Sequence, residues 1–124
     1  MTTEELQLGI GTEEAVTLKP EKVIPLAVSI EEVGTKKAKK VIITCKHPGK
    51  EEPIKISSVK FESKGKLETS GLWLNKDSKG LIRKGSGLAT FLQHNGANAI
   101  GDLTSKKELE TTTDDKGYLC FKAY

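Results

Sequence analysis

The chain has 124 residues, enough for one domain with one modest hydrophobic core. Charged residues make up 30% of it and the formal net charge is only +3, so the overall charge does not by itself identify a polyanion as the ligand. The sequence contains neither a long apolar run nor a signal-peptide pattern. We therefore expect a cytoplasmic protein with no membrane partner.

The basic residues are concentrated in the middle of the chain. Residues 1–33 carry seven acidic and two basic side chains, a balance of −5, and residues 34–84 carry fourteen basic and five acidic ones, a balance of +9. Residues 85–124 carry four basic and five acidic side chains, a balance of −1. This clustering predicts a surface that faces a polyanion, and the alternative is a lysine-rich face that only keeps the protein soluble.

The first 20 residues are polar and acidic, lack sustained periodicity, and are interrupted by Gly9 and Gly11. We expect residues 1–20 to form a loosely ordered arm and residues 21–124 to form the domain. An acidic arm ahead of a basic domain could fold over its basic surface and compete with a polyanion.

Three segments have the composition and alternation of strands, at 22–33, 41–47 and 53–63, and residues 67–75 form another extended piece before the helix. The first alternates through Ile24, Leu26, Val28 and Ile30, and its proline at position 25 is expected at a bulge or at an unpaired N–H. A turn at 34–40 with four lysines joins the first two segments into a hairpin. In the third segment, the change of phase at the paired serines 57 and 58 predicts a bulge or a strong bend.

Only one segment has a convincing helical pattern. Ser86 is a suitable N-cap, because its hydroxyl can accept from a backbone N–H two or three residues later. Gly96 supplies the positive φ that ends a helix. Leu88, Phe91 and Leu92 share one face between these limits, so the helix is expected to pack on a sheet.

Two further strands, at 107–113 and 118–124, flank a turn at Asp114–Gly117. Five or six strongly bent strands with a single helix predict a mainly β fold: a small OB-like Greek-key β-barrel with one short helix between strands 3 and 4. The alternatives are an immunoglobulin-like sandwich, which has no place for the helix, and a small helix-on-sheet fold.

Two stretches carry a family resemblance: residues 84–96, from Lys-Gly-Ser-Gly-Leu to Asn-Gly, and residues 100–106, Ile-Gly-Asp-Leu-Thr-Ser-Lys. Together they resemble the helix region of small single-stranded-nucleic-acid-binding OB-fold proteins of archaeal and phage type. The resemblance covers about a fifth of the chain. It implies an OB-fold whose strand face binds single strands, without specifying DNA or RNA.

Binding of a single strand requires cations along the phosphates and flat side chains on which bases stack. The candidate nucleic-acid-binding cations are Lys36, Lys37, Lys39, Lys40, Lys46, Lys55, Lys60, Arg83 and Lys84. The candidate stacking platforms are Phe61, Trp73 and Tyr118, whereas Phe91 and Phe121 are assigned to the core. For Trp73, which is flanked by two leucines, stacking and core packing are equally compatible with the sequence.

Two cysteines and two histidines, Cys45, His47, His94 and Cys120, could satisfy tetrahedral zinc, but their spacing matches no common zinc module. We expect no metal and no cofactor, and both cysteines to be reduced thiols. No nucleophile elbow, phosphate loop or helix-borne metal motif occurs, so we expect no enzymatic activity.

The sequence thus predicts a nucleic-acid-binding protein that prefers single strands to duplex. The alternative is a non-catalytic module for protein interaction or self-assembly. It would use an exposed strand edge, such as the terminal strand Tyr118–Tyr124, and a homo-oligomer would then be expected.

Overall fold

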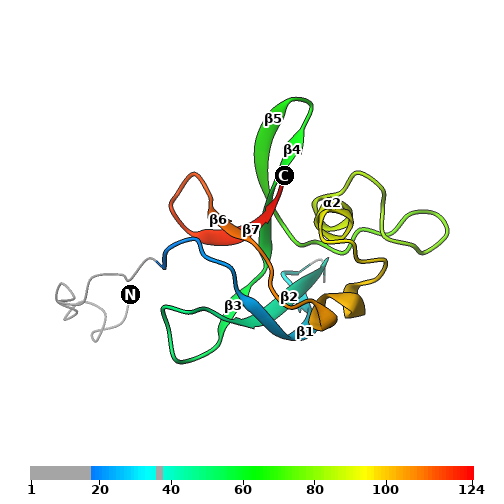
Figure 1. The fold of residues 1–124 in the computed structure, drawn as a ribbon. Coiled ribbons are helices and arrows are strands. Elements are labelled where there is room, and N and C mark those ends of the chain that lie inside the picture. Colours follow the sequence, from blue (N-terminus) through cyan, green and yellow to red (C-terminus); the bar gives the residue numbers. More distant parts are fainter. Residues whose placement is uncertain (1–17, 36–37) are drawn as a thin grey trace, which may run out of the picture.

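The structure is a computed structural model that describes residues 18–35 and 38–124. Most of the expected acidic arm, and two lysines of the turn at 34–40, lie outside these ranges. Within them the elements, in chain order, are β1 (Ile24–Val33), β2 (Ala38–Lys46), β3 (Ile54–Ile56), β4 (Ser58–Ser63), β5 (Lys66–Gly71), the helix α2 (Gly87–His94), the 3₁₀ helix η1 (Ile100–Ser105), β6 (Thr111–Thr113) and β7 (Leu119–Ala123). Figure 1 shows the β4–β5 hairpin projecting at the top of the view, with α2 beside it.

The strands form two sheets, and neither closes into a barrel. The first has the order β1-β2-β3 with antiparallel pairs, and the second has the order β5-β4-β7-β6, in which β4 and β7 are parallel. A mainly β fold with a small helix is therefore confirmed, whereas a closed barrel is not. The helix follows β5, because the third predicted strand is split in two and residues 66–71 form a further regular strand.

Backbone hydrogen bonds join the two sheets at more than one place. Val23 and Leu109 each donate their N–H to the carbonyl of the other, at 2.9 and 2.8 Å. At Ser57, between β3 and β4, the chain leaves β2 and pairs with β5 and β7 instead. The carbonyl of Ser57 accepts from the N–H of Leu72 at 2.8 Å. The predicted bend at the paired serines is thus confirmed, and it carries one strand from the first sheet into the second.

The predicted inward face of β1 is wrong for much of its length. The register with β2 slips after Pro25, so Leu26 has no opposite residue and the alternation changes phase. Pro25 is buried and Val28 packs against the core, but Ile24, Leu26 and Ile30 are about half exposed, at 47%, 50% and 48%. The expected bulge at the proline is therefore present. Because of the bulge, Ile24 and Val28 lie on opposite sides of β1, although strict alternation places them on one face.

The helix α2 begins and ends as predicted. The hydroxyl of Ser86 accepts from the N–H of Ala89 at 3.2 Å, and Gly96 follows the last turn with φ +66°. The buried side of the helix contacts β4, β5 and β7. Its ring at Phe91 stacks on Phe121 of β7, with centroids 4.8 Å apart. Both aromatic residues are fully buried, so their assignment to the core is confirmed.

The terminal strand β7 lies between β4 and β6 in its sheet. It is therefore not an edge, and the prediction that Tyr118–Tyr124 offers an exposed strand edge is wrong. Leu119, Phe121 and Ala123 face the core as expected. The strand is interior because it pairs in parallel with β4, and the sequence of a short terminal strand does not reveal that pairing.

The helices in the described part of the chain are too short or too polar to span a membrane.

Candidate nucleic-acid interface

The side chains that point away from the core on the central strands are mainly lysines and small polar residues. β2 buries Val41, Ile43 and Cys45, so the residues between them point outward. Paired residues on neighbouring strands lie on the same side of a sheet, so the registers extend this outward side from β2 to β3 and, in the second sheet, from β4 to β7. The two parts meet where Trp73 and Lys40 lie over Gly71, which pairs with Ser58 of β4. We call this surface the basic face. Its members are Lys40, Ile42, Thr44, Lys46, Lys55, Ser58, Lys60, Lys122, Trp73 and Tyr124.

Trp73 lies on the basic face and not in the core. Residues 72–74 pair with the start of β2, where Trp73 stands opposite Lys40. Because Leu72 is fully buried, the next residue turns outward, and Trp73 is only half-buried. The ammonium of Lys40 lies 5.0 Å from the centre of the indole ring, a favourable cation–π distance. The ring sits over Gly71, where a Cβ would lie 2.7 Å from Nε1.

A second cation–aromatic pair lies at the end of β7, between Lys122 in the strand and Tyr124 just after it. The ammonium of Lys122 is 5.0 Å from the centre of the Tyr124 ring, and Tyr124 is 42% exposed. Lys122 is also the register partner of Lys60 on β4, whose Nζ donates to the carbonyl of Thr113 at 3.3 Å. The Lys122 ammonium lies 3.9 Å from a carboxylate oxygen of Glu110, so part of the positive charge at this end is neutralised.

Small residues connect the two pairs. Ser58 at the start of β4 is paired with Gly71, over which the Trp73 ring lies. Lys60 follows two residues later on the same side of β4 and adjoins Lys122. The two cation–aromatic pairs are thus connected through Gly71, Ser58 and Lys60, and we call this line of residues, from Trp73 to Tyr124, the strip.

The lysine turn contributes less to this face than the sequence predicts. β2 begins at Ala38, so Lys39 and Lys40 lie in the strand and not at the hairpin tip. Successive strand residues alternate, and Lys39, which pairs with Glu32, is on the opposite side from Lys40. The prediction that both belong to one surface is therefore wrong. Lys36 and Lys37 lie outside the described residues.

The predicted cations Arg83 and Lys84 lie beyond the strands. Both are exposed, at the end of a hairpin formed by residues 75–83. The guanidinium Nη2 of Arg83 donates to the carbonyl of Lys76 at 3.2 Å. This hairpin continues directly from the segment 72–74, so the two cations flank the basic face and are not part of it.

Of the other two predicted stacking platforms, one is buried and one is exposed. Phe61 is only 8% exposed and belongs to the core, where it approaches Gly87 of α2 closely. Its placement on the binding surface is wrong, because it shares the inward parity of Val59. Tyr118 is 68% exposed beside the turn at 114–117, so its ring is accessible.

The residues required for a zinc site are not brought together. Cys45 and Cys120 are buried free thiols, while His94 is exposed at the end of α2. Burial raises the pKa of both thiols to about 11, and the Asp114 carboxylate adds to the effect at Cys120. Both are therefore protonated at neutral pH, whereas metal ligation requires the thiolate. Within the described ranges, no cluster of three or more His, Cys, Asp or Glu side chains could hold a metal ion.

His47 has a structural role that the sequence did not reveal. It is 1% exposed, and its Nδ1 accepts from the N–H of Gly49 at 2.9 Å. The proton must then be on Nε2, which lies 2.7 Å from the carbonyl oxygen of Lys19 and donates to it. The ring thereby ties the segment before β1 to the end of β2.

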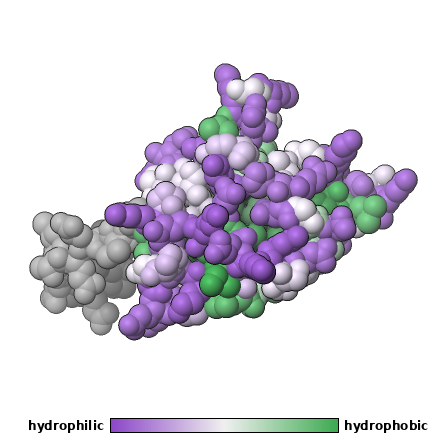
Figure 2. Space-filling model, in the orientation of Figure 1, coloured by the Kyte–Doolittle hydropathy of each residue, from purple (hydrophilic) through white to green (hydrophobic). Residues whose placement is uncertain are grey.

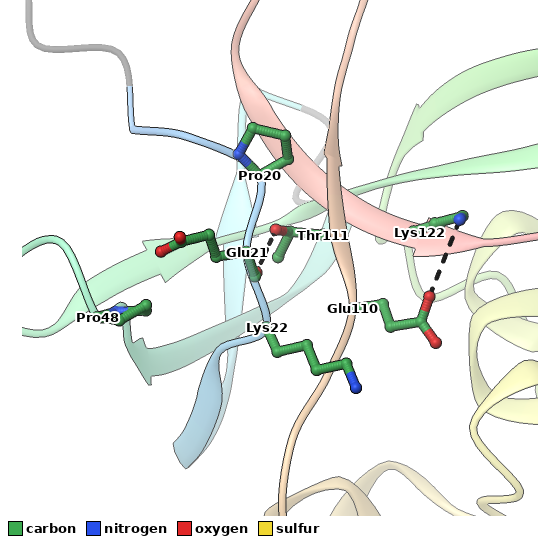
Figure 3. A pocket seen from close by; sticks show the side chains of 7 residues that line it. All are labelled: Pro20, Glu21, Lys22, Pro48, Glu110, Thr111 and Lys122. Atoms are coloured by element: carbon green, nitrogen blue, oxygen red, sulfur yellow. Dashed lines mark hydrogen bonds and ion pairs between the residues drawn. The ribbon is translucent and has the colours of Figure 1, made fainter.

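A shallow pocket lies beside this attachment (Figure 3). The residues that line it are Pro20, Glu21, Lys22, Pro48, Glu110, Thr111 and Lys122. One wall is fixed by a hydrogen bond from the hydroxyl of Thr111 to the carbonyl of Glu21. Acidic and basic groups alternate around the pocket, so its charge selects no ligand class. It borders the basic face at Lys122.

The sequence interpretation missed Lys122, Tyr124 and Gly71. The first two could have been found from the alternation of the last strand, because inward Phe121 and Ala123 place the residues beside them on the outer side. The role of Gly71 could not have been found from the sequence, since it depends on where the Trp73 ring lies.

Comparisons with protein-family models, with curated proteins and with solved structures found no match.

Proposed function

We propose that this protein binds single-stranded nucleic acid, DNA or RNA, along the basic face. The observation that carries the proposal is the position of Trp73. A lone tryptophan is normally packed inside a small domain, but this one is held on the outer surface by Gly71 and by the Lys40 ammonium, with part of its ring exposed. Such a ring is a stacking platform for a base, and the adjacent ammonium is placed for a phosphate.

The distribution of cations supports a linear ligand. Lys40, Lys60 and Lys122 follow one another across β2, β4 and β7, with an aromatic ring at each end of the strip. Single strands expose the faces of their bases, whereas a duplex hides them within its stack. We therefore propose a preference for single strands, with Trp73 and Tyr124 each stacking on a base.

We also propose that the scaffold is an OB-type barrel. The support is the order of neighbours: from β1 through β2, the bent strand β3–β4, β7 and β6, the contact between Val23 and Leu109 returns to β1. In an OB-fold the second and third strands carry the binding surface. The corresponding strands here, β2 and β3–β4, carry Lys40, Lys46, Lys55 and Lys60.

The test is a fluorescence-anisotropy titration with labelled single-stranded DNA, single-stranded RNA and duplex DNA at two salt concentrations. Wild-type protein is expected to bind both single strands more tightly than duplex, with affinity falling as salt rises. Trp73→Ala should weaken single-strand binding by roughly 1–3 kcal/mol, the range for the loss of one base stack. Lys60→Glu should weaken binding and reduce the salt dependence, because fewer counterions are released.

The matched control is Lys107→Glu, which makes the same charge change at an exposed residue between η1 and β6 that is not a member of the basic face. If it weakens binding as much as Lys60→Glu, binding follows net charge and the proposed face is incorrect. Equal affinity of wild-type protein and Trp73→Ala would remove the stacking role. The circular dichroism spectra of all variants should match that of the wild type.

One observation favours a second candidate function, self-association through β1. β1 is an edge strand of its sheet, and Ile24, Leu26, Ile30 and Val33 are between 41% and 50% exposed. Figure 2 shows apolar surface along the lower edge of the molecule, where Figure 1 places β1. Exposed apolar edges pair with other strands. Light scattering after size exclusion distinguishes the two functions, since self-association predicts a dimer that Leu26→Lys dissociates without loss of oligonucleotide binding.

A further inference from the structure

The hairpin of residues 75–83 is a rigid projection next to Trp73. Its ends are joined by the N–H of Arg83, which donates to the carbonyl of Asn75 at 2.8 Å. The carboxylate of Asp77 accepts from the N–H groups of Lys79 and Leu81, at 2.9 and 3.0 Å, and thus fixes the turn. Figure 1 shows this hairpin extending at the right of the view, beyond α2.

The hairpin presents an apolar tip. Leu81 is 63% exposed, more than any other aliphatic residue in the part of the chain that the structure describes, while its neighbour Ile82 packs against the core. The hydrogen bonds of the turn fix the backbone at Leu81, whose side chain is exposed to solvent. In Figure 2 the same region shows apolar surface between hydrophilic side chains.

Cations surround this tip. Between Glu68 and Asp102 the sequence contains one acidic residue, Asp77. Its carboxylate accepts hydrogen bonds from two backbone N–H groups of the turn. The basic residues of the same stretch are Lys76, Lys79, Arg83 and Lys84, all exposed. Residues 75–84 therefore carry a formal net charge of +3. A leucine within such a cluster meets both requirements for contact with nucleic acid, charge for the phosphates and an apolar surface for a base.

We propose that this hairpin recognises the junction where a single strand enters a duplex. In this arrangement the single strand lies on the basic face, Leu81 contacts the terminal base pair, and the surrounding cations contact phosphates of the duplex. The inference rests on the proposed function, because the basic face must hold the single-stranded part.

The position of the hairpin is the reason to favour a junction over a longer single strand. It leaves the strand segment directly after Trp73, and it projects away from the sheets instead of continuing their surface. A flexible single strand on the sheets has no need of a rigid projection. A duplex end presents a flat apolar base pair flanked by two phosphate chains, which matches an apolar tip flanked by cations.

The experiment compares two labelled DNA probes, a single strand and the same single strand extended by a short hairpin duplex. Wild-type protein is expected to bind the extended probe about fivefold more tightly, the scale set by burial of most of one leucine side chain. Leu81→Ser should reduce this preference to less than twofold while leaving the affinity for the plain single strand unchanged. The matched control is Leu67→Ser, which removes a leucine of 48% exposure from the other projecting hairpin. It should retain the preference.

Equal binding of the two probes by wild-type protein, or an unchanged preference in Leu81→Ser, would overturn the inference while single-strand binding through Trp73 still stands. If wild-type protein binds neither probe, both the inference and the proposed function fail. Sedimentation with vesicles of phosphatidylserine and phosphatidylcholine provides the last arm. Binding to vesicles that depends on Leu81, together with equal binding of the two DNA probes, would assign the hairpin to a lipid surface and overturn the junction role.

Discussion

Gly71→Ala tests the orientation of Trp73 without removing the ring or any charge. The added Cβ would lie 2.7 Å from Nε1 and 3.1 Å from Cε2 of the indole, and 3.0 Å from Cε of Lys40. Ordinary carbon contacts are about 3.5–4.0 Å, so the ring must move by about 1 Å and the lysine must move with it. Part of the base stack and of the cation–π contact should be lost. We expect single-strand affinity to fall by about 1 kcal/mol, or roughly fivefold, at the lower end of the range for one stack.

The protein should remain folded. Gly71 does not have a positive φ, so alanine fits its backbone, and replacing glycine at such a position stabilises by about 0.4–1 kcal/mol through the unfolded state. The free energy of unfolding should therefore stay within about 1 kcal/mol of the wild type. Because Trp73 is the only tryptophan in the chain, its fluorescence reports the displacement directly. The emission maximum should shift to longer wavelength as the ring becomes more exposed.

Gly101→Ala is the matched control, since a Cβ at that position meets nothing within 4 Å. It should leave both emission and binding unchanged. A shifted emission in Gly71→Ala with unchanged affinity would refute the stacking role, because the ring would have moved without consequence. Unchanged emission together with unchanged affinity would refute the packing of the ring over Gly71.

Three further predictions concern the core and its attachments. Phe91→Ala should lower the free energy of unfolding by about 3–5 kcal/mol in urea titrations, because it removes a fully buried ring stacked on another; a loss below about 1 kcal/mol would contradict that packing. His47→Ala should cost about 1–3 kcal/mol, because the carbonyl of Lys19 and the N–H of Gly49 lose their partner, and the Gly49 amide should exchange faster with deuterium. Burial raises the pKa of the Cys45 and Cys120 thiols from 9.0 to about 11, so the folded protein holds these two protons more tightly than the unfolded chain. The resulting contribution to stability is fully present below pH 9 and is lost as the pH rises toward 11. At pH 10 the loss is about 1 kcal/mol for each thiol, so the difference in stability between wild type and the double alanine variant should shrink from pH 8 to pH 10; a constant difference would exclude the effect.

Local rules were sufficient wherever a short stretch of sequence decides the conformation. Ser86 and Gly96 delimit the helix because a cap hydroxyl and a positive φ act on neighbouring backbone groups. The paired serines at 57 and 58 marked the bend, because the apolar alternation changes phase there. The mainly β composition follows from the same kind of pattern.

The faces of the strands were decided by the tertiary structure. The proline at position 25 marked the bulge, but which of Ile24, Leu26 and Val28 face the core depends on the register with β2, which an alternating sequence does not show. Likewise, Phe61 and Trp73 look alike as aromatic residues in strand-like segments. The pairing of residues 72–74 with β2 places Trp73 outside, whereas Phe61 shares the inner side with the helix.

The kinds of element, the helix limits and the concentration of positive charge in mid-chain follow from the order of residues, because they depend on near neighbours and on composition. The folded chain was needed to show that the last strand is interior, that Lys122 adjoins Lys60, and that the indole ring lies over Gly71. Each of these depends on contacts between residues far apart in the chain. Such contacts are selected by the packing of the whole core and not by any local pattern.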